Sequence, residues 1–419
     1  MKIVFLKQGS FLENIGGAER ALANCANLLF DLGHDVICVG AQPVFLENIY
    51  ELKKGIRINN LNTAGQEFKG TLLHKFLREL TQPLLKKGIV TDYYEQDVLK
   101  ETAQSLQQLL NREHPDLLVA FSKKDAAILK YVRLPKGKTA VMLHGGERDI
   151  RDIFEPQNKH IYEGLKRADC CLVLLPYQKK LLQVRLPGKK IHIIPNIIDV
   201  VQGKAGEKES YSREEMPASV DFGAAQASNS KNIVMLARMI PSKRPDLLIK
   251  AFALAQSQEV KSAPLTKWTV HLYGRFLKAD FDWKIKTLIR KLNLEEKVFL
   301  KGETNIPAQV LARTDIFVFP SAEEGFGLAL AEAMAAGVHC LAAADCRAAV
   351  CLLEEGECGL LRDPNPESFA QGLRLLMERA ELRQDLGERG KKAVCKYGRE
   401  KLKIKWEQIL QNEDNDSSL

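Results

Sequence analysis

The chain has 419 residues, of which 45% are hydrophobic and 27% charged, and its formal net charge is +8. This composition is typical of a globular protein and excludes a disordered or fibrous chain, while the length exceeds what one ordinary hydrophobic core supports, so we expect two domains. The modest positive charge suits an anionic partner, but it does not choose among a nucleotide, a phospholipid surface and a nucleic acid.

The chain begins with a short apolar segment, residues 3–6, which is flanked by a lysine on each side. This pattern indicates a buried first strand rather than a secretory signal. No apolar run approaches the ~20 residues that a membrane-spanning helix needs. We therefore expect a protein of the cytosol, or one bound to the cytosolic face of a membrane.

The first third of the chain alternates apolar strands with helical stretches. A helix is predicted from Gly16-Gly17 to Phe30, and buried strands at 3–6, 36–39, 117–121, 139–143, 171–175 and 191–196. This alternation predicts an α/β fold in which a parallel sheet carries helices on both faces. We place this Rossmann-like, acceptor-side domain at residues 1–205.

The composition changes at residues 206–230, which are rich in Gly, Ser, Glu, Lys and Ala and have little periodicity. They form the predicted linker, although a long surface loop within one domain is the alternative. The alternation then restarts, with strands at 232–236, 268–273, 298–301, 316–320 and 338–342. A second doubly wound domain is predicted at 231–395, followed by a helix at 396–412. Ligands of such sheets bind at the carboxyl ends of the strands, so a cleft between the two domains is the expected site.

The most specific pattern runs from Glu324 to Glu332. A strand ends at Pro320, and a loop containing Gly325 and Gly327 leads into a helix of small residues. Glycines ahead of a helix let a ligand approach the backbone, whose free N–H groups favour an anion. The two glutamates then contact two parts of one ligand. The alternatives are a helix-terminus carboxylate for Glu324 and a solvated helix residue for Glu332; the apolar neighbours of Glu332 favour partial burial and a hydroxyl or cationic partner.

Arg238 and Lys243 follow the first strand of the second domain. Two cations on one strand-end loop suit a diphosphate whose charge grows as its sugar leaves, and a solvated basic loop is the alternative. In the first domain, Gly16 and Gly17 follow the first strand and place backbone N–H groups near a phosphate or sugar. His144 ends a strand ahead of two glycines, so a role in the cleft and a structural role are both open.

No metal site is predicted. The nine cysteines show no C-x2-C spacing, and several lie in apolar runs, so we interpret them as free buried thiols. Asp280-Phe281-Asp282 matches the Asp-x-Asp pattern with which another class of sugar transferases holds a metal. Because it precedes a helical stretch rather than ending a buried strand, we interpret it as a helix start.

Together these motifs resemble the family 4 retaining glycosyltransferases, which have two Rossmann-like domains in the GT-B architecture. The resemblance covers most of the chain and depends on the order of five segments: Gly16–Glu19, His144, Ile194–Asp199, Arg238 with Lys243, and Glu324 through Glu332.

The resemblance implies a role for each of these residues. Arg238 and Lys243 bind the donor diphosphate, Glu324 binds hydroxyls of the transferred sugar, and Glu332 holds the ribose. The backbone of Gly325, Phe326 and Gly327 meets the sugar and phosphates, and His144 lies beside the donor sugar. The last helix crosses back onto the first domain. The donor is a UDP-, GDP- or ADP-sugar, no cofactor is needed, and the leaving phosphate itself accepts the acceptor's proton.

The sequence departs from the family pattern at three places that bear on donor choice. Residues 344–350 replace a Gly-Gly-x-Pro-Glu stretch, Arg244 replaces a glycine after Lys243, and Arg275-Phe276 replaces a second glycine near Gly274.

The acceptor is expected on the first domain. The segment from Lys69 to Lys87 is basic and amphipathic, which suits an anionic membrane surface and a lipid-linked acceptor, whereas an ordinary core helix with one solvated face is the alternative. We favour a transferase that extends a cell-surface polysaccharide, oligosaccharide or glycolipid. A soluble transferase making a small sugar or sugar phosphate, and a non-catalytic nucleotide-binding subunit, remain open. No aromatic-interleaved basic motif points to a nucleic acid.

Overall fold

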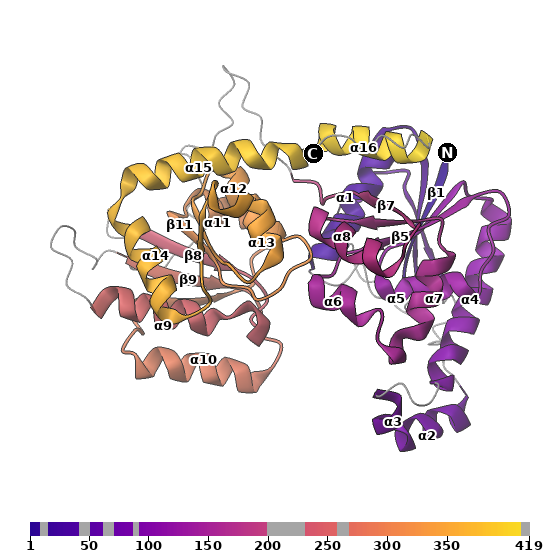
Figure 1. Cartoon of the computed structure of the whole chain (residues 1–419), viewed down its shortest axis with the longest axis horizontal. Helices are drawn as coiled ribbons and strands as arrows, with labels where there is room; N and C mark the ends of the chain where they lie inside the picture. The colour runs from indigo at the N-terminus through magenta and orange to yellow at the C-terminus, as the bar shows by residue number, and fades with distance from the viewer. Residues whose placement is uncertain are drawn as a thin grey trace. The chain divides into compact units, whose positions relative to one another are not determined.

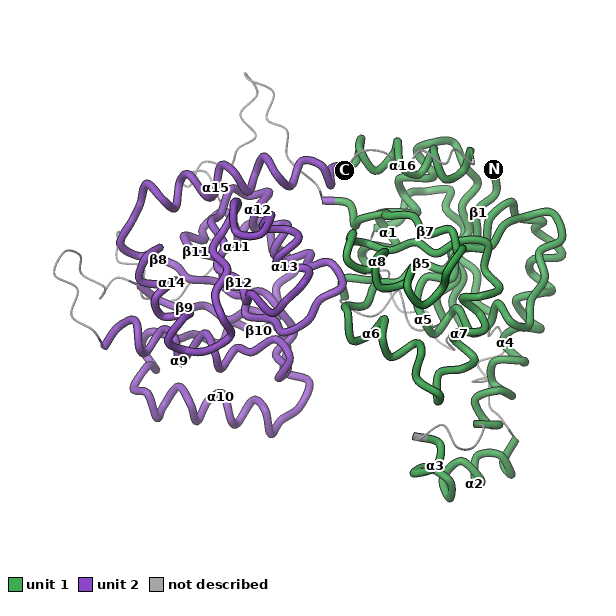
Figure 2. The backbone as a smooth tube through the Cα atoms, in the orientation of Figure 1, with its two compact units in different colours: residues 1–197, 399–419 green, residues 198–398 purple. Residues whose placement is uncertain are grey.

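The computed structural model describes residues 1–8, 16–41, 51–61, 71–86, 92–198, 231–257 and 268–411. The chain falls into two compact units (Figures 1 and 2). Unit 1 consists of residues 1–197 and 399–419, and unit 2 of residues 198–398. The predicted linker at 206–230 lies outside the described residues.

Within the described residues, unit 1 has a seven-stranded sheet in the order β3-β2-β1-β4-β5-β6-β7, with every neighbouring pair parallel. The strand order reverses between β1 and β4, so the loops that leave these two strands separate at the carboxyl edge, where such sheets bind ligands. The strands are β1 (Lys2–Lys7), β2 (Asp35–Gly40), β3 (Arg57–Asn60), β4 (Leu117–Ala120), β5 (Lys138–Leu143), β6 (Cys170–Val173) and β7 (Lys190–Ile193).

The helices of unit 1 cover this sheet, apart from a projection formed by α2 and α3 at one end of α4 (Figure 1). They are α1 (Gly17–Asp31), α2 (Leu72–Leu80), α3 (Gln82–Lys86), α4 (Tyr93–Glu113), α5 (Lys123–Ala126), α6 (Glu147–Asp152), α7 (Lys159–Arg167), α8 (Pro176–Arg185) and α16 (Arg399–Gln411). The last of these comes from the end of the chain. Trp406 on α16 is fully buried and meets the ring of Phe5 edge-on at a centroid distance of 6.4 Å. Arg399 forms an ion pair with Asp31 of α1. The terminal helix is therefore part of unit 1.

Unit 2 has a six-stranded sheet among its described residues, in the order β10-β9-β8-β11-β12-β13 and again parallel throughout. Here the order reverses between β8 and β11, which places the equivalent ligand-binding edge at the loops that follow these two strands. The strands are β8 (Lys231–Leu236), β9 (Trp268–Tyr273), β10 (Val298–Gly302), β11 (Ile316–Phe319), β12 (Cys340–Ala343) and β13 (Leu360–Arg362).

Helices cover the second sheet as well, and α9 packs against α14 although the two are far apart in the sequence. They are α9 (Pro245–Ser257), α10 (Ala279–Lys291), α11 (Pro307–Ala312), α12 (Leu328–Ala335), α13 (Arg347–Leu352), α14 (Pro366–Glu378) and α15 (Ala380–Val394). Phe252 of α9 and Phe369 of α14 are both fully buried in the core of this unit. The predicted fold of two doubly wound sheets is confirmed.

Some details differ from the sequence prediction. The predicted strand 171–175 ends at Val173, because Leu175 is already the N-cap of α8 and Pro176 begins that helix. Two short strands, β3 and β13, were missed because neither carries a run of buried apolar residues. All nine cysteines lie in the described part of the chain and are free, as predicted, and most of them are buried.

Candidate functional site

The residues predicted to bind the donor gather at the carboxyl edge of the second sheet. The loop after β8 contains Arg238 and Lys243, and the loop after β11 contains Glu324. Since β8 and β11 are parallel neighbours, both loops leave the sheet at the same edge. A hydrogen bond from the Ala322 N–H to the Ser242 carbonyl oxygen, 2.8 Å long, joins the two loops. Segments some eighty residues apart in the sequence thus form one surface at the point where the strand order reverses.

Lys243 and Glu324 form an ion pair at the centre of this surface. The Lys243 Nζ lies 2.6 Å from the Glu324 Oε1 and donates a 3.1 Å hydrogen bond to the Glu323 carbonyl oxygen. Lys243 is only 8% exposed, so its ammonium needs such partners. An ammonium has three donors, and these two contacts leave the third for a ligand.

Arg238 behaves differently from Lys243. Its side chain is exposed, and it forms no ion pair with any residue in the described part of the chain. The backbone beside it is held by hydrogen bonds, since the Met239 N–H donates to the Arg275 carbonyl oxygen at 2.9 Å. A guanidinium on an ordered loop, not yet committed to a carboxylate, is suited to bind phosphate oxygens in a bidentate manner.

The loop from Ser321 to Gly327, called the cradle loop below, leads from β11 to α12. Gly327 has a φ of 91°, and a side chain there would lie 3.3 Å from both Leu352 and Phe319. Phe326 is buried and packs edge-on against Tyr397 at a centroid distance of 5.1 Å, which anchors the loop. The Ser321 hydroxyl is buried and has no hydrogen-bond partner among the described residues.

Gly325 and Glu332 complete the predicted set at this edge. Gly325 is partly exposed in the cradle loop, directly before buried Phe326. Glu332 lies in the second turn of α12 and is half-buried, as the sequence predicted, between buried Ala331 and Ala333.

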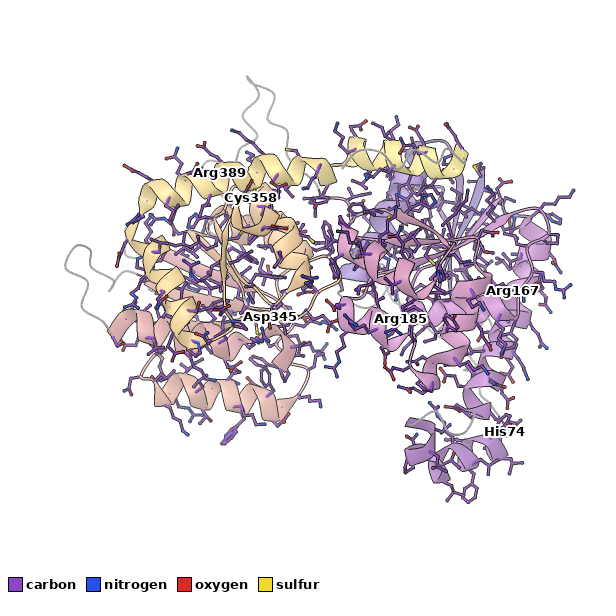
Figure 3. All side chains as sticks on the ribbon, in the orientation of Figure 1. His74, Arg167, Arg185, Asp345, Cys358 and Arg389 are labelled. Carbon is purple, nitrogen blue, oxygen red and sulfur yellow. The ribbon has the colours of Figure 1, made fainter. Side chains whose placement is uncertain are left out.

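A second ion pair adds a third loop to the site. Arg244, next to Lys243, has a left-handed backbone with a φ of 50°. Its guanidinium binds both carboxylate oxygens of Asp345 at 2.8 and 2.7 Å, and Asp345, labelled in Figure 3, follows β12. The pair joins two of the three places where the sequence departs from the family pattern. Arg244 follows β8 and Asp345 follows β12, the two strands on either side of β11, so the strand order is needed to see that the two residues can meet.

Cys346 lies beside the charges of this edge. Burial raises the pKa of its thiol to about 12, and the nearby Glu324 carboxylate acts in the same direction. The thiol is therefore protonated at neutral pH and is a packing residue rather than a nucleophile.

The corresponding edge of unit 1 contains His144, directly after β5. Its ring packs on Phe121 at a centroid distance of 4.3 Å, and both ring nitrogens are buried without a hydrogen-bond partner among the described residues. Burial, helped by the charge of Lys7, lowers the pKa of His144 to about 3. The imidazole is thus neutral at physiological pH and has a donor and an acceptor for a ligand hydroxyl.

Two charged residues near this edge, Lys7 and Asp125, were missed by the sequence prediction. Lys7, at the end of β1, lies 3.5 Å from Glu19 of α1. Asp125, after β4, is fully buried and accepts hydrogen bonds from the Gln8 N–H at 2.8 Å and the Ser122 hydroxyl at 2.6 Å. Burial raises the pKa of Asp125. Lys7 and Asp125 both lie where the strand order reverses, between β1 and β4, and this position can be recognised only once the strand order is known.

Gly16 and Gly17 lie at the beginning of α1. Gly16 is the N-cap in an extended conformation, and a side chain there would collide with the Glu19 carboxylate. Gly17 is the exposed first residue of the helix. The preceding residues 9–15 lie outside the described part of the chain.

Asp280 and Asp282 lie in the first turn of α10 and are paired along the helix with Lys284 at 3.8 Å and Lys286 at 2.7 Å. Their interpretation as a helix start is confirmed. Among the described residues, no three His, Cys, Asp or Glu side chains are grouped so that they could hold a metal ion. None of the described helices is both long and apolar enough to cross a membrane.

Comparison with known proteins identifies the family. Residues 221–393, most of unit 2, match the family described as glycosyl transferases group 1. Unit 2 thus resembles this family over most of its length. An uncharacterized glycosyltransferase of Haemophilus influenzae is 27% identical over 421 residues, which cover 96% of this chain and 99% of that protein. A poly(ribitol-phosphate) alpha-N-acetylglucosaminyltransferase of Staphylococcus aureus is 31% identical over 266 residues. That match covers 63% of this chain and 48% of the Staphylococcus aureus enzyme.

A solved structure shares the fold of this chain. HepE of Anabaena, crystallised with UDP and glucose, has a TM-score of 0.69 at 19% identity and covers 98% of this chain and 100% of that chain. At this level of identity the likeness concerns the fold. It confirms for this chain the predicted GT-B architecture.

Proposed function

We propose that this glycosyltransferase moves a sugar from a nucleotide-diphosphate sugar to an acceptor hydroxyl, retaining the anomeric configuration and using no metal ion. The observation that carries the proposal is the arrangement of Arg238, Lys243 and Glu324 at the reversal point of the second sheet. Two cations and a carboxylate there match the two halves of such a donor, since the diphosphate needs positive charge and the sugar offers hydroxyls.

The cations do the electrostatic work in this proposal. Arg238 and the third donor of Lys243 bind the diphosphate, whose negative charge grows as the bond to the sugar breaks. In a metal-free reaction these two side chains take the place that a divalent cation fills in other transferases. The exposed N–H groups at the start of α12, behind Gly327, add a third favourable contribution for the phosphates.

The carboxylates orient the donor. Glu324 accepts hydrogen bonds from the sugar hydroxyls while Lys243 holds it in place. Glu332, one turn into α12, binds the ribose. At the carboxyl edge of unit 1, neutral His144 is suited to bind a sugar hydroxyl. In the transfer, the bond from the anomeric carbon to the phosphate oxygen breaks, a bond to the acceptor oxygen forms on the same face, and the acceptor proton passes to the released diphosphate. The protein contributes positioning and charge.

For the donor base we favour uridine, and for the acceptor a polysaccharide or a lipid-linked glycan precursor. The Anabaena neighbour was crystallised with UDP, and the Staphylococcus aureus relative glycosylates a poly(ribitol-phosphate) polymer by its name. A cytosolic protein bound peripherally to a membrane suits a lipid-linked acceptor, and the basic segment from Lys69 to Lys87 supports that location.

Site-directed variants test the proposal. Arg238→Ala should lower kcat/KM about tenfold to a thousandfold, because it removes a charge that acts on the leaving diphosphate. Lys243→Ala should do the same, although it also leaves Glu324 without its partner. Arg238 is therefore the cleaner test, and Lys291→Ala, an exposed cation at the end of α10, is the matched control. Activity should persist in excess chelator. Unchanged kinetics for both Arg238→Ala and Lys243→Ala would show that the donor binds elsewhere.

A further inference from the structure

The helix α2 packs on unit 1 with its polar side. His74 lies 2.6 Å from Asp97 of α4, and Arg78 lies 2.9 Å from Asp92 at the N-cap of that helix. The Thr71 hydroxyl also donates to Asp97, at 3.3 Å. Figure 3 labels His74 at the junction between the projection and α4. An ordinary surface helix does the reverse, burying its apolar side and exposing its charges.

The opposite side of α2 is apolar and exposed. None of its residues is buried, which shows that the core-helix alternative for this segment is wrong in the described part. Phe76 is 59% exposed and Leu72 86%. We use the term apolar face for the exposed large hydrophobic side chains of α2 together with one from α3: Leu72, Leu73, Phe76, Leu77, Leu80 and Leu84. A contiguous patch of this kind marks a binding surface in soluble proteins.

We propose that the apolar face docks on an anionic lipid bilayer. The charge of the segment argues for lipid rather than for a second copy of the chain: besides Arg78, which is paired with Asp92, residues 69–87 contain four lysines and one Glu. Two such basic segments would repel each other, whereas anionic headgroups attract them. Lys75 is exposed on α2 beside Phe76, where its amine reaches headgroups while the apolar side chains enter the acyl region.

An exposed aromatic residue lies near the polar side of α2. Tyr93, the first residue of α4, is 54% exposed, and its ring lies 5.5 Å from that of His74. Tyrosine favours the boundary between headgroups and acyl chains. The hydrogen bond of His74 to Asp97 and the ion pair of Arg78 with Asp92 keep α2 attached to α4, so membrane docking needs no refolding. The inference deepens the proposed peripheral location and rests on it, but it is independent of the donor chemistry.

Vesicle flotation of the full chain tests the proposal. Wild-type protein should float with phosphatidylcholine vesicles that contain phosphatidylglycerol, less at high salt, and not with phosphatidylcholine alone. The double variant Leu73→Ser with Phe76→Ser should lower partitioning about a hundredfold. The matched control is Val184→Ser with Ile404→Ser, since these side chains of unit 1 are 80% and 50% exposed away from α2. Lys75→Glu should lower partitioning into the anionic vesicles about tenfold and leaves the apolar face unchanged. This variant still tests the proposal if the double variant does not fold.

Several outcomes would overturn the proposal. One is that the wild-type protein does not bind the anionic vesicles. Another is that the double variant floats like the wild type. A third is that the wild type forms a concentration-dependent dimer instead of binding vesicles, and that the double variant abolishes this dimer while the control variant does not. Transfer to a soluble acceptor separates this inference from the proposed function. If docking is wrong, wild type transfers sugar but does not float, and if the transferase proposal is wrong, it floats but transfers nothing.

Discussion

Arg244 has a backbone conformation that glycine adopts freely, so the contrast between Arg244→Gly and Arg244→Ala measures what its ion pair contributes. The φ of 50° costs a residue with a side chain about 1–2 kcal/mol. Glycine relieves this strain but loses about 0.4–1 kcal/mol through the greater freedom of its unfolded chain. The net advantage of glycine over alanine at this position is thus about 1 kcal/mol.

The ion pair is the opposing contribution. Arg244 and Asp345 are 26% and 39% exposed at their side chains, so solvent screens them and their bidentate contact stabilises by only about 0.5–1 kcal/mol. Arg244→Ala loses the pair and keeps the strain, so it should be less stable than wild type by about that amount. Arg244→Gly loses the pair and the strain together, so it should lie within about 0.5 kcal/mol of wild type.

Thermal unfolding of unit 2 provides the measurement, because a difference of 1 kcal/mol shifts the Tm of a unit of this size by about 2–4 °C. Asp345→Asn is the matched control and should resemble Arg244→Ala, since it weakens the same pair from the other side. Equal losses for Arg244→Gly and Arg244→Ala would refute the reasoning, because the left-handed backbone would then cost nothing measurable.

Two other predictions concern pH and the cradle loop. His144 has a pKa of about 3 in the folded protein against an ordinary value of 6.5, so its contribution to stability is complete above pH 6.5 and is lost as the pH falls toward 3. His144→Phe keeps the packing on Phe121. Between pH 6.5 and 4 it should reduce the slope of the unfolding free energy against pH by up to about 1.4 kcal/mol per pH unit. An unchanged slope would mean that the His144 ring is solvated. Gly327→Ala should destabilise by about 1–3 kcal/mol and lower kcat/KM, since it adds strain at a φ of 91° and crowds Leu352. Gly302→Ala is the control, because Gly302 has a φ of 69° and an added side chain would meet nothing within 4 Å, so this variant adds backbone strain alone. If Gly302→Ala lowered stability and kcat/KM as much as Gly327→Ala, the role given to the cradle loop would be contradicted.

Local pattern predicted much of the fold. Runs such as residues 316–319 are apolar throughout because their strand is covered on both faces, and a window of a few residues reveals this. Strands without that burial, such as β3, escaped the prediction because their sequence resembles a loop. The boundary at Leu175 was misjudged because an apolar residue caps a helix there, where a polar cap is the usual signal.

The candidate site likewise combines features that the sequence predicts with features that only the folded structure shows. The sequence alone determined that Arg238, Lys243 and Glu324 lie in loops behind buried strands, because strand ends and glycines are encoded locally. Only the tertiary structure decided that Lys243 meets Glu324, that Arg244 meets Asp345, and that α2 turns its apolar face to solvent. The first two depend on the order in which the strands lie in the sheet, and the third on which side of a helix finds a charged partner. These are contacts between distant segments, and their energies appear only when the chain is folded.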